Sequence, residues 1–215
     1  LRCACYRLQD SAAATHSDSS TVSNSNRLMA DPELTPRPGI LLIAPPVLED
    51  PNFRRAVVLL CEHGNEGSFG LILNRPIDLQ LSDVMEEVVV YDDTINLGGP
   101  VKRDTLHFLH RYDEALPDAI TLPNGVQWGG DFATLRTLME SGDIAKQDLR
   151  FFVGYAGWSP GQLENEIDAG GWILAESSPD AVFAEEPSTL WRAVLRKMGG
   201  QYAVLANFPD DPRMN

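Results

Sequence analysis

Two apolar segments separated by a turn signal place the strongest constraint on the fold of this chain. Residues 56–61 (AVVLLC) are continuously apolar and β-branched near their start, which is typical of a strand buried on both faces. Residues 64–67 (GNEG) form a turn signal, and residues 68–73 (SFGLIL) supply a returning strand. Asn74-Arg75-Pro76 ends that strand, because proline cannot continue a central ladder. The sequence therefore predicts a β-hairpin over residues 56–73.

The rest of the chain alternates strand-like and helix-like segments. Further strands are predicted at residues 39–44, 94–97, 105–109 and 150–155, and a last strand at residues 201–206. Helices are predicted at residues 82–88, 131–141 and 188–198, with a helix start at residues 162–167. Ser82, Asp131 and Ser188 are the expected N-caps of the first three. Hairpins combined with βα units predict an α+β fold, or a mixed α/β fold with a mixed sheet.

Length and composition indicate one domain with an N-terminal appendage. The 215 residues are 43% hydrophobic, which is enough to bury a core. Residues 11–26 (SAAATHSDSSTVSNSN) are too polar to offset the entropy of ordering. We therefore expect a disordered, serine-rich extension at residues 1–36 and a single domain at residues 37–215. The extension has weak transit-peptide features, but Met29-Ala30-Asp31 looks like a natural start, so whether residues 1–28 belong to the natural protein stays open.

Charge and cysteine content narrow the classes of partner. The chain has 17 Lys and Arg against 31 Asp and Glu, a net charge of −14 that repels phosphate backbones and argues against direct nucleic-acid binding. No apolar run is long enough to predict a membrane span. An odd count of 3 cysteines without framework spacing favours a reducing compartment, so we expect a cytoplasmic protein. With nucleic acid and membrane disfavoured, we expect the chain to bind a protein partner or a small ligand.

Residues 157–161 (GWSPG) match the G-x-S-x-G pattern of a nucleophile elbow. Pro160 removes the backbone N–H group that an oxyanion hole would use, and no histidine follows Ser159 in the chain. A residue before proline favours the β region, which an N-cap requires. Ser159 followed three residues later by Gln162 also matches a capping box. We therefore interpret Ser159 as a helix N-cap, and no residue is assigned as catalytic.

Several motifs occurring in one order resemble the AlgH/YqgE family of bacterial proteins, which also has plant relatives. They are GILLIAPP (39–46), FRRAVVLLCEHGNEGSFGLILNRP (53–76), LGGPV (97–101), LHFLH (106–110), GYAGWSPGQLENEI (154–167), GW (171–172) and LWRAVL (190–195). The resemblance covers roughly residues 38–208 and implies a cytosolic α+β protein with a mixed, coiled β-sheet packed against several helices; a three-layer-like α/β arrangement is the alternative. Some members are described as putative transcriptional regulators, and the family implies no particular biochemical activity.

Several polar residues at the ends of predicted elements are candidates for ligand binding. His63 lies at the hairpin turn and shares a strand face with Cys61, which is compatible with a metal, although a hydrogen-bonded turn histidine is the preferred interpretation. Arg75 can bind a carboxylate or phosphate, and Gly98-Gly99 offers backbone N–H groups. The full candidate set is His63, Asn74, Arg75, Gly98, Gly99, Pro100, Gln162 and Glu166. No metal and no cofactor are assigned.

Two functional hypotheses follow. The first is a non-enzymatic regulatory or interaction protein that acts through a protein partner or a small ligand, because no complete catalytic set is present. The alternative is a hydrolase-type enzyme, which requires His63, Asn74, Arg75 and Glu166 to converge in one cleft.

Overall fold

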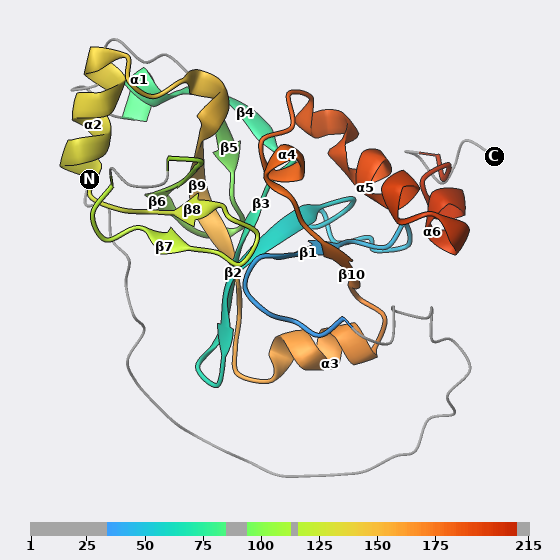
Figure 1. Ribbon diagram of the computed structural model, residues 1–215. Helices are drawn as coiled ribbons and strands as arrows, with labels where there is room; N and C mark the ends of the chain where they lie inside the picture. The colour runs from blue at the N-terminus through green and yellow to red at the C-terminus, as the bar shows by residue number, and fades with distance from the viewer. Residues whose placement is uncertain (1–33, 85–93, 113–115, 210–215) are drawn as a thin grey trace.

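The structure is a computed structural model that describes residues 34–84, 94–112 and 116–209 (Figure 1). Its strands are β1 (Ile40–Ile43), β2 (Val57–Gly64), β3 (Gly67–Ile72), β4 (Pro76–Gln80), β5 (Thr94–Leu97), β6 (Val101–His110), β7 (Ile120–Thr121), β8 (Gln127–Trp128), β9 (Leu149–Trp158) and β10 (Ile173–Glu176). Its α-helices are α1 (Leu81–Val84), α2 (Phe132–Ser141), α3 (Gln162–Asp168), α4 (Pro179–Val182), α5 (Leu190–Met198) and α6 (Gly200–Leu205). The fold is α+β with a mixed sheet packed against helices, as predicted.

The described strands form one open sheet in the order β10-β1-β2-β3-β9-β6-β8-β7, with β5 joining β4 to β9. Every pairing is antiparallel except that of β5 with β9, which is parallel. The long strand β9 holds the two halves together, because it pairs with β3 near its carboxyl end and with β6 and β5 along the rest of its length.

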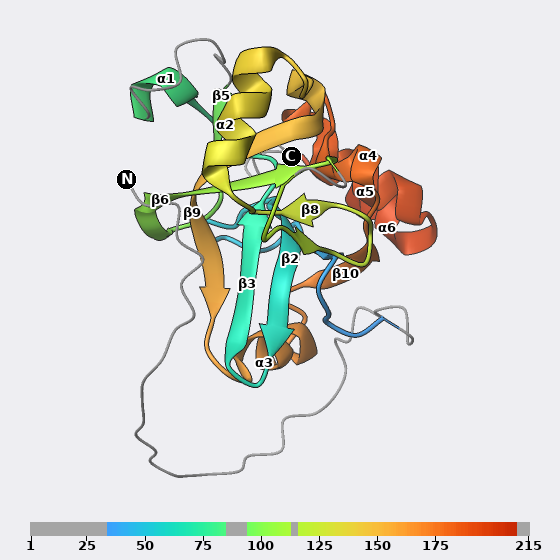
Figure 2. The same ribbon diagram turned by 60° about the vertical axis from the view of Figure 1, so that its left-hand side comes forward.

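The predicted hairpin forms the centre of this sheet. In β2 and β3, Val58 lies opposite Ile72, and Gly64 lies opposite Gly67, so Asn65 and Glu66 make the turn. The register shifts between Leu60 and Glu62, which is a β-bulge. Figure 2 shows the two strands side by side, with α3 packed near the turn.

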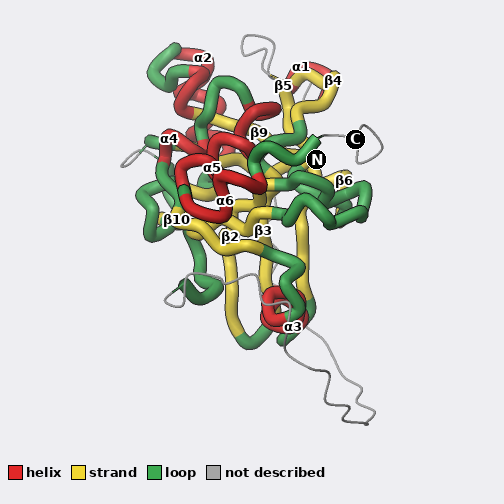
Figure 3. Tube along the Cα trace, turned by 90° about the vertical axis from the view of Figure 1, so that its right-hand side faces the viewer, coloured by secondary structure: helices red, strands yellow, loops and turns green. Residues whose placement is uncertain are grey.

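Helices cover both faces of this half of the sheet. Alternate residues of β1 point to opposite faces: Leu41 and Ile43 belong to a core shared with α5, and Ile40 and Leu42 belong to a core shared with α3. Figure 3 shows α4, α5 and α6 in front of the strands and α3 at the far end of the hairpin. A third core packs α2 against β5, β6 and β9. The continuous apolar runs of the sequence are thus explained by burial on both faces.

Several local predictions need correction. Residues 201–206 form helix α6 and not a strand: Tyr202, Leu205 and Ala206 share the face that packs on the core, a helical spacing. The predicted end of the returning strand at Asn74-Arg75-Pro76 is confirmed, because β3 ends at Ile72; Pro76 is the first residue of the next strand, β4, a position where a missing N–H group is tolerated. The predicted helix at residues 82–88 starts at Leu81, and its residues 85–88 lie outside the described chain.

The predicted caps have different outcomes. Asp131 caps α2 by accepting a hydrogen bond from the Thr134 backbone N–H group, as expected. Ser188 does not cap α5, which begins at Leu190 with Thr189 as its N-cap and no side-chain cap; the Ser188 hydroxyl donates to Glu186 instead. The N-cap of α3 is Gly161 and not Ser159. Gln162 nevertheless accepts from the Ser159 backbone N–H group at 3.0 Å, which is the glutamine half of the predicted capping box.

Candidate functional site: an arginine-lined pocket

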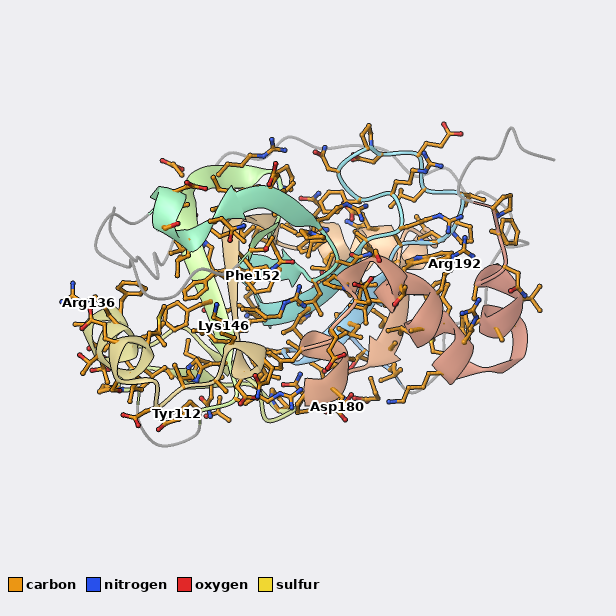
Figure 4. All side chains as sticks on the ribbon, turned by 90° about the horizontal axis from the view of Figure 1, so that it is seen from above. Tyr112, Arg136, Lys146, Phe152, Asp180 and Arg192 are labelled. Carbon is orange, nitrogen blue, oxygen red and sulfur yellow. The ribbon has the colours of Figure 1, made fainter. Side chains whose placement is uncertain are left out.

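A pocket of about 460 Å³ opens where the start of β2, the end of β3 and helix α5 meet. Its described lining residues are Arg54, Arg55, Asn74, Arg75, Pro76, Ser188, Trp191 and Arg192. Figure 4 shows Arg192 beside the loop that follows β1, on the side of the molecule occupied by α5 and α6. A cavity of this size is in the range that holds small ligands.

Asn74 organises the floor of the pocket. Its side chain is buried, accepts a hydrogen bond from the Val57 backbone N–H group at 2.9 Å, and donates to the Arg55 carbonyl oxygen at 2.8 Å. Both amide atoms therefore satisfy backbone groups at the point where the loop enters β2. Asn74 therefore bridges the start of β2 and the end of β3.

Trp191 forms one wall of the pocket. Its side chain is buried, and its indole N–H group donates to the Ala44 carbonyl oxygen at 2.8 Å, which fixes α5 to the end of β1. The Arg55 guanidinium lies 4.5 Å from the centre of the Trp191 ring, and that of Arg192 lies 5.9 Å from it. Cation–π contacts of this kind hold both guanidinium groups beside the Trp191 ring.

Backbone carbonyl groups accept hydrogen bonds from the pocket arginines. Arg75 donates to the carbonyl oxygens of Asn74, at 3.3 Å, and of Arg54. Arg55 donates to the carbonyl oxygen of Phe208 at 2.8 Å, and Arg192 donates to the same oxygen at 3.1 Å. Two guanidinium groups from different elements thus converge on a single oxygen atom.

The charge of this pocket is opposite to that of the protein as a whole. Four lining residues are arginines, and none of the described lining residues is acidic, although the chain carries a net charge of −14. Burial lowers the pKa of the Arg75 guanidinium from its ordinary value, yet arginine stays charged at neutral pH. The arrangement is suited to binding an anion through charge-assisted hydrogen bonds.

The other candidates from the sequence lie elsewhere. His63 is at the opposite end of the hairpin from Asn74, where its Nδ1 atom lies 2.9 Å from Ser68 Oγ and its Nε2 atom lies 3.6 Å from Glu164 Oε1. Ser68 is its direct cross-strand neighbour, so the hydrogen-bonded turn histidine is the better description. The described residues contain no group of three or more His, Cys, Asp or Glu that could hold a metal, and Cys61 is buried in the core with its thiol pKa raised by burial.

Gln162 and Glu166 form a separate polar cluster on α3. Gln162 donates to Glu166 Oε1 at 2.9 Å, and Glu166 Oε2 accepts from the indole groups of Trp158 at 2.9 Å and Trp172 at 2.8 Å. Both tryptophans are buried and pack with Phe53. The carboxylate therefore satisfies two buried donors, which is a structural role.

The Gly98-Gly99-Pro100 segment is packed against β9. The Gly98 N–H group donates to the Val153 carbonyl oxygen at 2.9 Å, and its own carbonyl accepts from Ile72 at 2.9 Å. A Cβ atom at Gly98 would lie 2.2 Å from the Gly154 carbonyl oxygen. The glycines allow this close approach of two backbones, and the Gly98 N–H group is used in the sheet and not in a ligand cradle.

These positions contradict the four-residue cleft of the hydrolase alternative. His63 and Glu166 lie near the hairpin turn and α3, whereas Asn74 and Arg75 lie at the far end of the same hairpin. Six residues of extended strand separate the two ends, roughly 20 Å at about 3.3 Å per residue. Only Asn74 and Arg75 of the candidate set line the pocket.

Comparison with known proteins assigns the family. The AlgH-like family model matches residues 41–203, which is most of the chain. The chain belongs to the AlgH-like family. Among similar proteins, a UPF0301 protein of Cytophaga hutchinsonii is 44% identical over 82% of this chain and 98% of its own length. A UPF0301 protein of Chlorobaculum tepidum is 42% identical over 83% of this chain and 96% of its own length.

Solved structures of similar proteins have the same fold. A crystal structure of a Corynebacterium diphtheriae protein aligns with a TM-score of 0.70 and 26% identity, covering 81% of this chain and 94% of the other. The solution structure of the AlgH protein from Pseudomonas aeruginosa aligns with a TM-score of 0.64 and 28% identity, covering 80% and 94%. Within the described residues of this AlgH-like chain, no helix has the length and apolar character needed to cross a bilayer.

Sequence reasoning missed three pocket arginines of this AlgH-like protein. From the sequence, Arg54 and Arg55 are interpreted as an ordinary basic pair, and Arg192 as a cation towards the carboxyl-terminal end of the helix predicted at residues 188–198. The signal available in the sequence was the presence of these arginines in an otherwise acidic chain. Their proximity, however, depends on how α5 returns to the start of β2, which no local pattern reveals.

Proposed function

We propose that this AlgH-like protein is a non-enzymatic, cytoplasmic regulatory or interaction protein whose activity depends on a small anion bound in the arginine-lined pocket. The observation that carries the proposal is the concentration of four arginines, from three segments of the chain, in one pocket of an acidic protein. Guanidinium groups supply charged N–H donors, which bind anions through charge-assisted hydrogen bonds. In this regulatory role, the bound anion alters the contacts that the protein makes with a protein partner.

The geometry supports binding better than catalysis. Guanidinium groups are charged donors that stay protonated at neutral pH, and they supply neither a nucleophile nor a base. The polar lining residues other than the arginines are Asn74, whose amide atoms both bond backbone groups, and Ser188, whose hydroxyl donates to Glu186. The nearest equivalent of a hydrolytic set, Ser68 with His63 and Glu164, lies at the other end of the hairpin.

The experiment compares anion binding by the full chain and by pocket variants. Titration calorimetry with inorganic phosphate, at constant ionic strength, is expected to show saturable binding to the wild type. The double variant Arg75→Gln/Arg192→Gln should lose binding, because each substitution removes a charged donor from the pocket. Arg136→Gln is the matched control, since Arg136 lies on α2 outside the pocket and pairs with Glu140.

Circular dichroism of the three proteins verifies that the variants are folded. Phosphate also stabilises proteins by exclusion from their surfaces, so a shift in unfolding temperature alone does not test the site. If phosphate binds none of the proteins, or binds the double variant as tightly as the wild type, the pocket is not an anion site and the proposal is wrong.

A further inference from the structure

Two arginines of the pocket hold the last described residues of the chain. Arg55 donates to the carbonyl oxygens of Phe208, at 2.8 Å, and of Pro209. Arg192 donates to those of Ala206 and of Phe208, the latter at 3.1 Å. These carbonyl groups follow the end of helix α6, where a helix leaves its carbonyl groups to be satisfied by other donors. The two arginines therefore fix the backbone that follows α6.

The C-terminal strap, which we define as residues 207–209, is held less firmly than the helix before it. Ala206 is fully buried in the core, whereas Asn207 and Phe208 are exposed, and Phe208 retains 42% of its accessible surface. The backbone N–H groups of Asn207 and Phe208 each donate to a carbonyl oxygen of α6 at 3.1 Å, in a single tight turn. A segment with little buried apolar surface opens at a low free-energy cost. Ala206 thus separates the packed helix from a segment that local opening can release.

The strap and a pocket anion require the same donors. Arg55 and Arg192 both line the pocket, and their guanidinium groups also donate to the strap. The strap offers neutral carbonyl oxygens, whereas a phosphate oxygen carries negative charge and accepts stronger hydrogen bonds from guanidinium groups. An anion in the pocket therefore competes with the strap for these donors. Because such a coupling is reciprocal, the anion weakens the hold on the strap and the strap weakens anion binding by the same factor.

We propose that the C-terminal strap is an autoinhibitory element, which occupies the pocket arginines in the absence of an anion and is released when an anion binds. This inference rests on the proposed anion-binding function and names the element that the anion moves. Release frees residues 207–209 and leaves α6 in place, because Ala206 stays packed in the core. The freed strap is the surface through which the anion changes the contacts with a protein partner.

Hydrogen exchange of the full chain tests the release directly. The amides of Asn207 and Phe208 are protected by their bonds to α6 while the strap is in place. Saturating inorganic phosphate should speed their exchange at least about 3-fold relative to chloride at the same pH and ionic strength. Exclusion of phosphate from protein surfaces favours the compact state and would slow exchange, so it does not mimic this effect. The amides of Gly170 and Gly171, in the turn that ends α3, are the control and should exchange no faster in phosphate.

A glycine variant loosens the strap without changing its carbonyl groups or its charge. Phe208→Gly/Pro209→Gly raises the conformational entropy of the released segment, which favours release. Titration calorimetry should therefore show phosphate binding roughly 3- to 10-fold more tightly to this variant than to the wild type. Ser159→Gly/Pro160→Gly is the matched control, because it changes another exposed residue–proline pair, just before α3 and outside the pocket. Its phosphate affinity should equal that of the wild type.

The outcomes separate the strap from the anion site. If phosphate binds the wild type but leaves the exchange of Asn207 and Phe208 unchanged, the strap does not compete with the anion. The same holds if the glycine variant binds phosphate no more tightly than the wild type. Either result overturns this inference while anion binding stands. If phosphate binds neither the wild type nor the glycine variant, the proposed function itself is wrong.

Discussion

The indole N–H group of Trp158 donates to Glu166 Oε2 at 2.9 Å, across the junction between β9 and α3. The same oxygen accepts from Trp172 at 2.8 Å, at the entry to β10. One carboxylate oxygen therefore connects two strands that lie on either side of α3 in the sequence. The contact explains why an acidic residue of this helix faces buried aromatic side chains.

Glu166→Ala should lower the free energy of unfolding by about 2–4 kcal/mol, because it leaves two buried indole donors without their acceptor. Glu166→Gln should cost less, since its amide oxygen still has two lone pairs. Glu164→Ala is the control on the same helix; it removes a half-exposed contact with His63 and should cost less than about 1 kcal/mol. Urea denaturation measures all three, and equal losses for Glu166→Ala and Glu164→Ala would contradict the assignment.

Asn74→Ala should destabilise the protein by about 2–4 kcal/mol, because both buried backbone partners of the amide, Val57 N–H and Arg55 C=O, lose their hydrogen bonds. It should also weaken anion binding, since Asn74 positions the Arg55 backbone. Asn52→Ala, at an exposed loop position, should change stability by less than about 1 kcal/mol. Denaturant titration and phosphate calorimetry check the two effects, and a fully stable Asn74→Ala protein would show that the bridge is dispensable.

Gly98→Ala should prevent correct packing or cost several kcal/mol, on the order of 3 or more, because its Cβ would lie 2.2 Å from the Gly154 carbonyl oxygen. Gly64→Ala is the steric control: a Cβ at Gly64 meets nothing within 4 Å. Thermal unfolding of both variants tests the prediction. A Gly98→Ala protein that unfolds at the same temperature as Gly64→Ala would refute the close approach of the two backbones.

Stability should fall as the pH is lowered, partly through His107. Burial against Phe69 of β3 and Tyr155 of β9 lowers the pKa of His107 from 6.5 to about 4, so the unfolded chain binds its proton first. Its contribution is complete above pH 6.5 and is lost progressively as the pH falls from 6.5 towards 4. Between pH 7 and pH 5 this histidine should cost about 2 kcal/mol.

His107→Gln removes this titrating group. The loss of unfolding free energy between pH 7 and pH 5 should therefore be about 2 kcal/mol smaller in the variant than in the wild type. Urea denaturation of the wild type and the variant at pH 7 and pH 5 measures how much the free energy of unfolding of each protein changes between the two pH values. The buried His110 has a pKa lowered by burial as well, so some pH dependence should persist in the variant. Parallel pH profiles for the two proteins would mean that His107 is not the titrating group.

Patterns within a short segment predicted most of the central fold. The apolar runs of β2 and β3 flank a Gly-Asn-Glu-Gly turn, and Asp131 and Gly142 bracket an amphipathic helix, so propensity, burial and capping agree at these places. The last predicted strand failed because residues 201–206 are too few for periodicity to separate strand from helix. Packing of Tyr202, Leu205 and Ala206 on the core decided in favour of helix.

The sequence by itself determined the hairpin, the α2 helix, the family and the acidic composition, because each depends on neighbouring residues or on residue counts. Only the tertiary structure decided where the positive charge gathers. Arg55, Arg75 and Arg192 are distant in the chain and meet because Trp191 anchors α5 to the end of β1 while Asn74 joins the two ends of the hairpin. Such a site is formed by long-range packing, which brings together side chains that carry no common local signal.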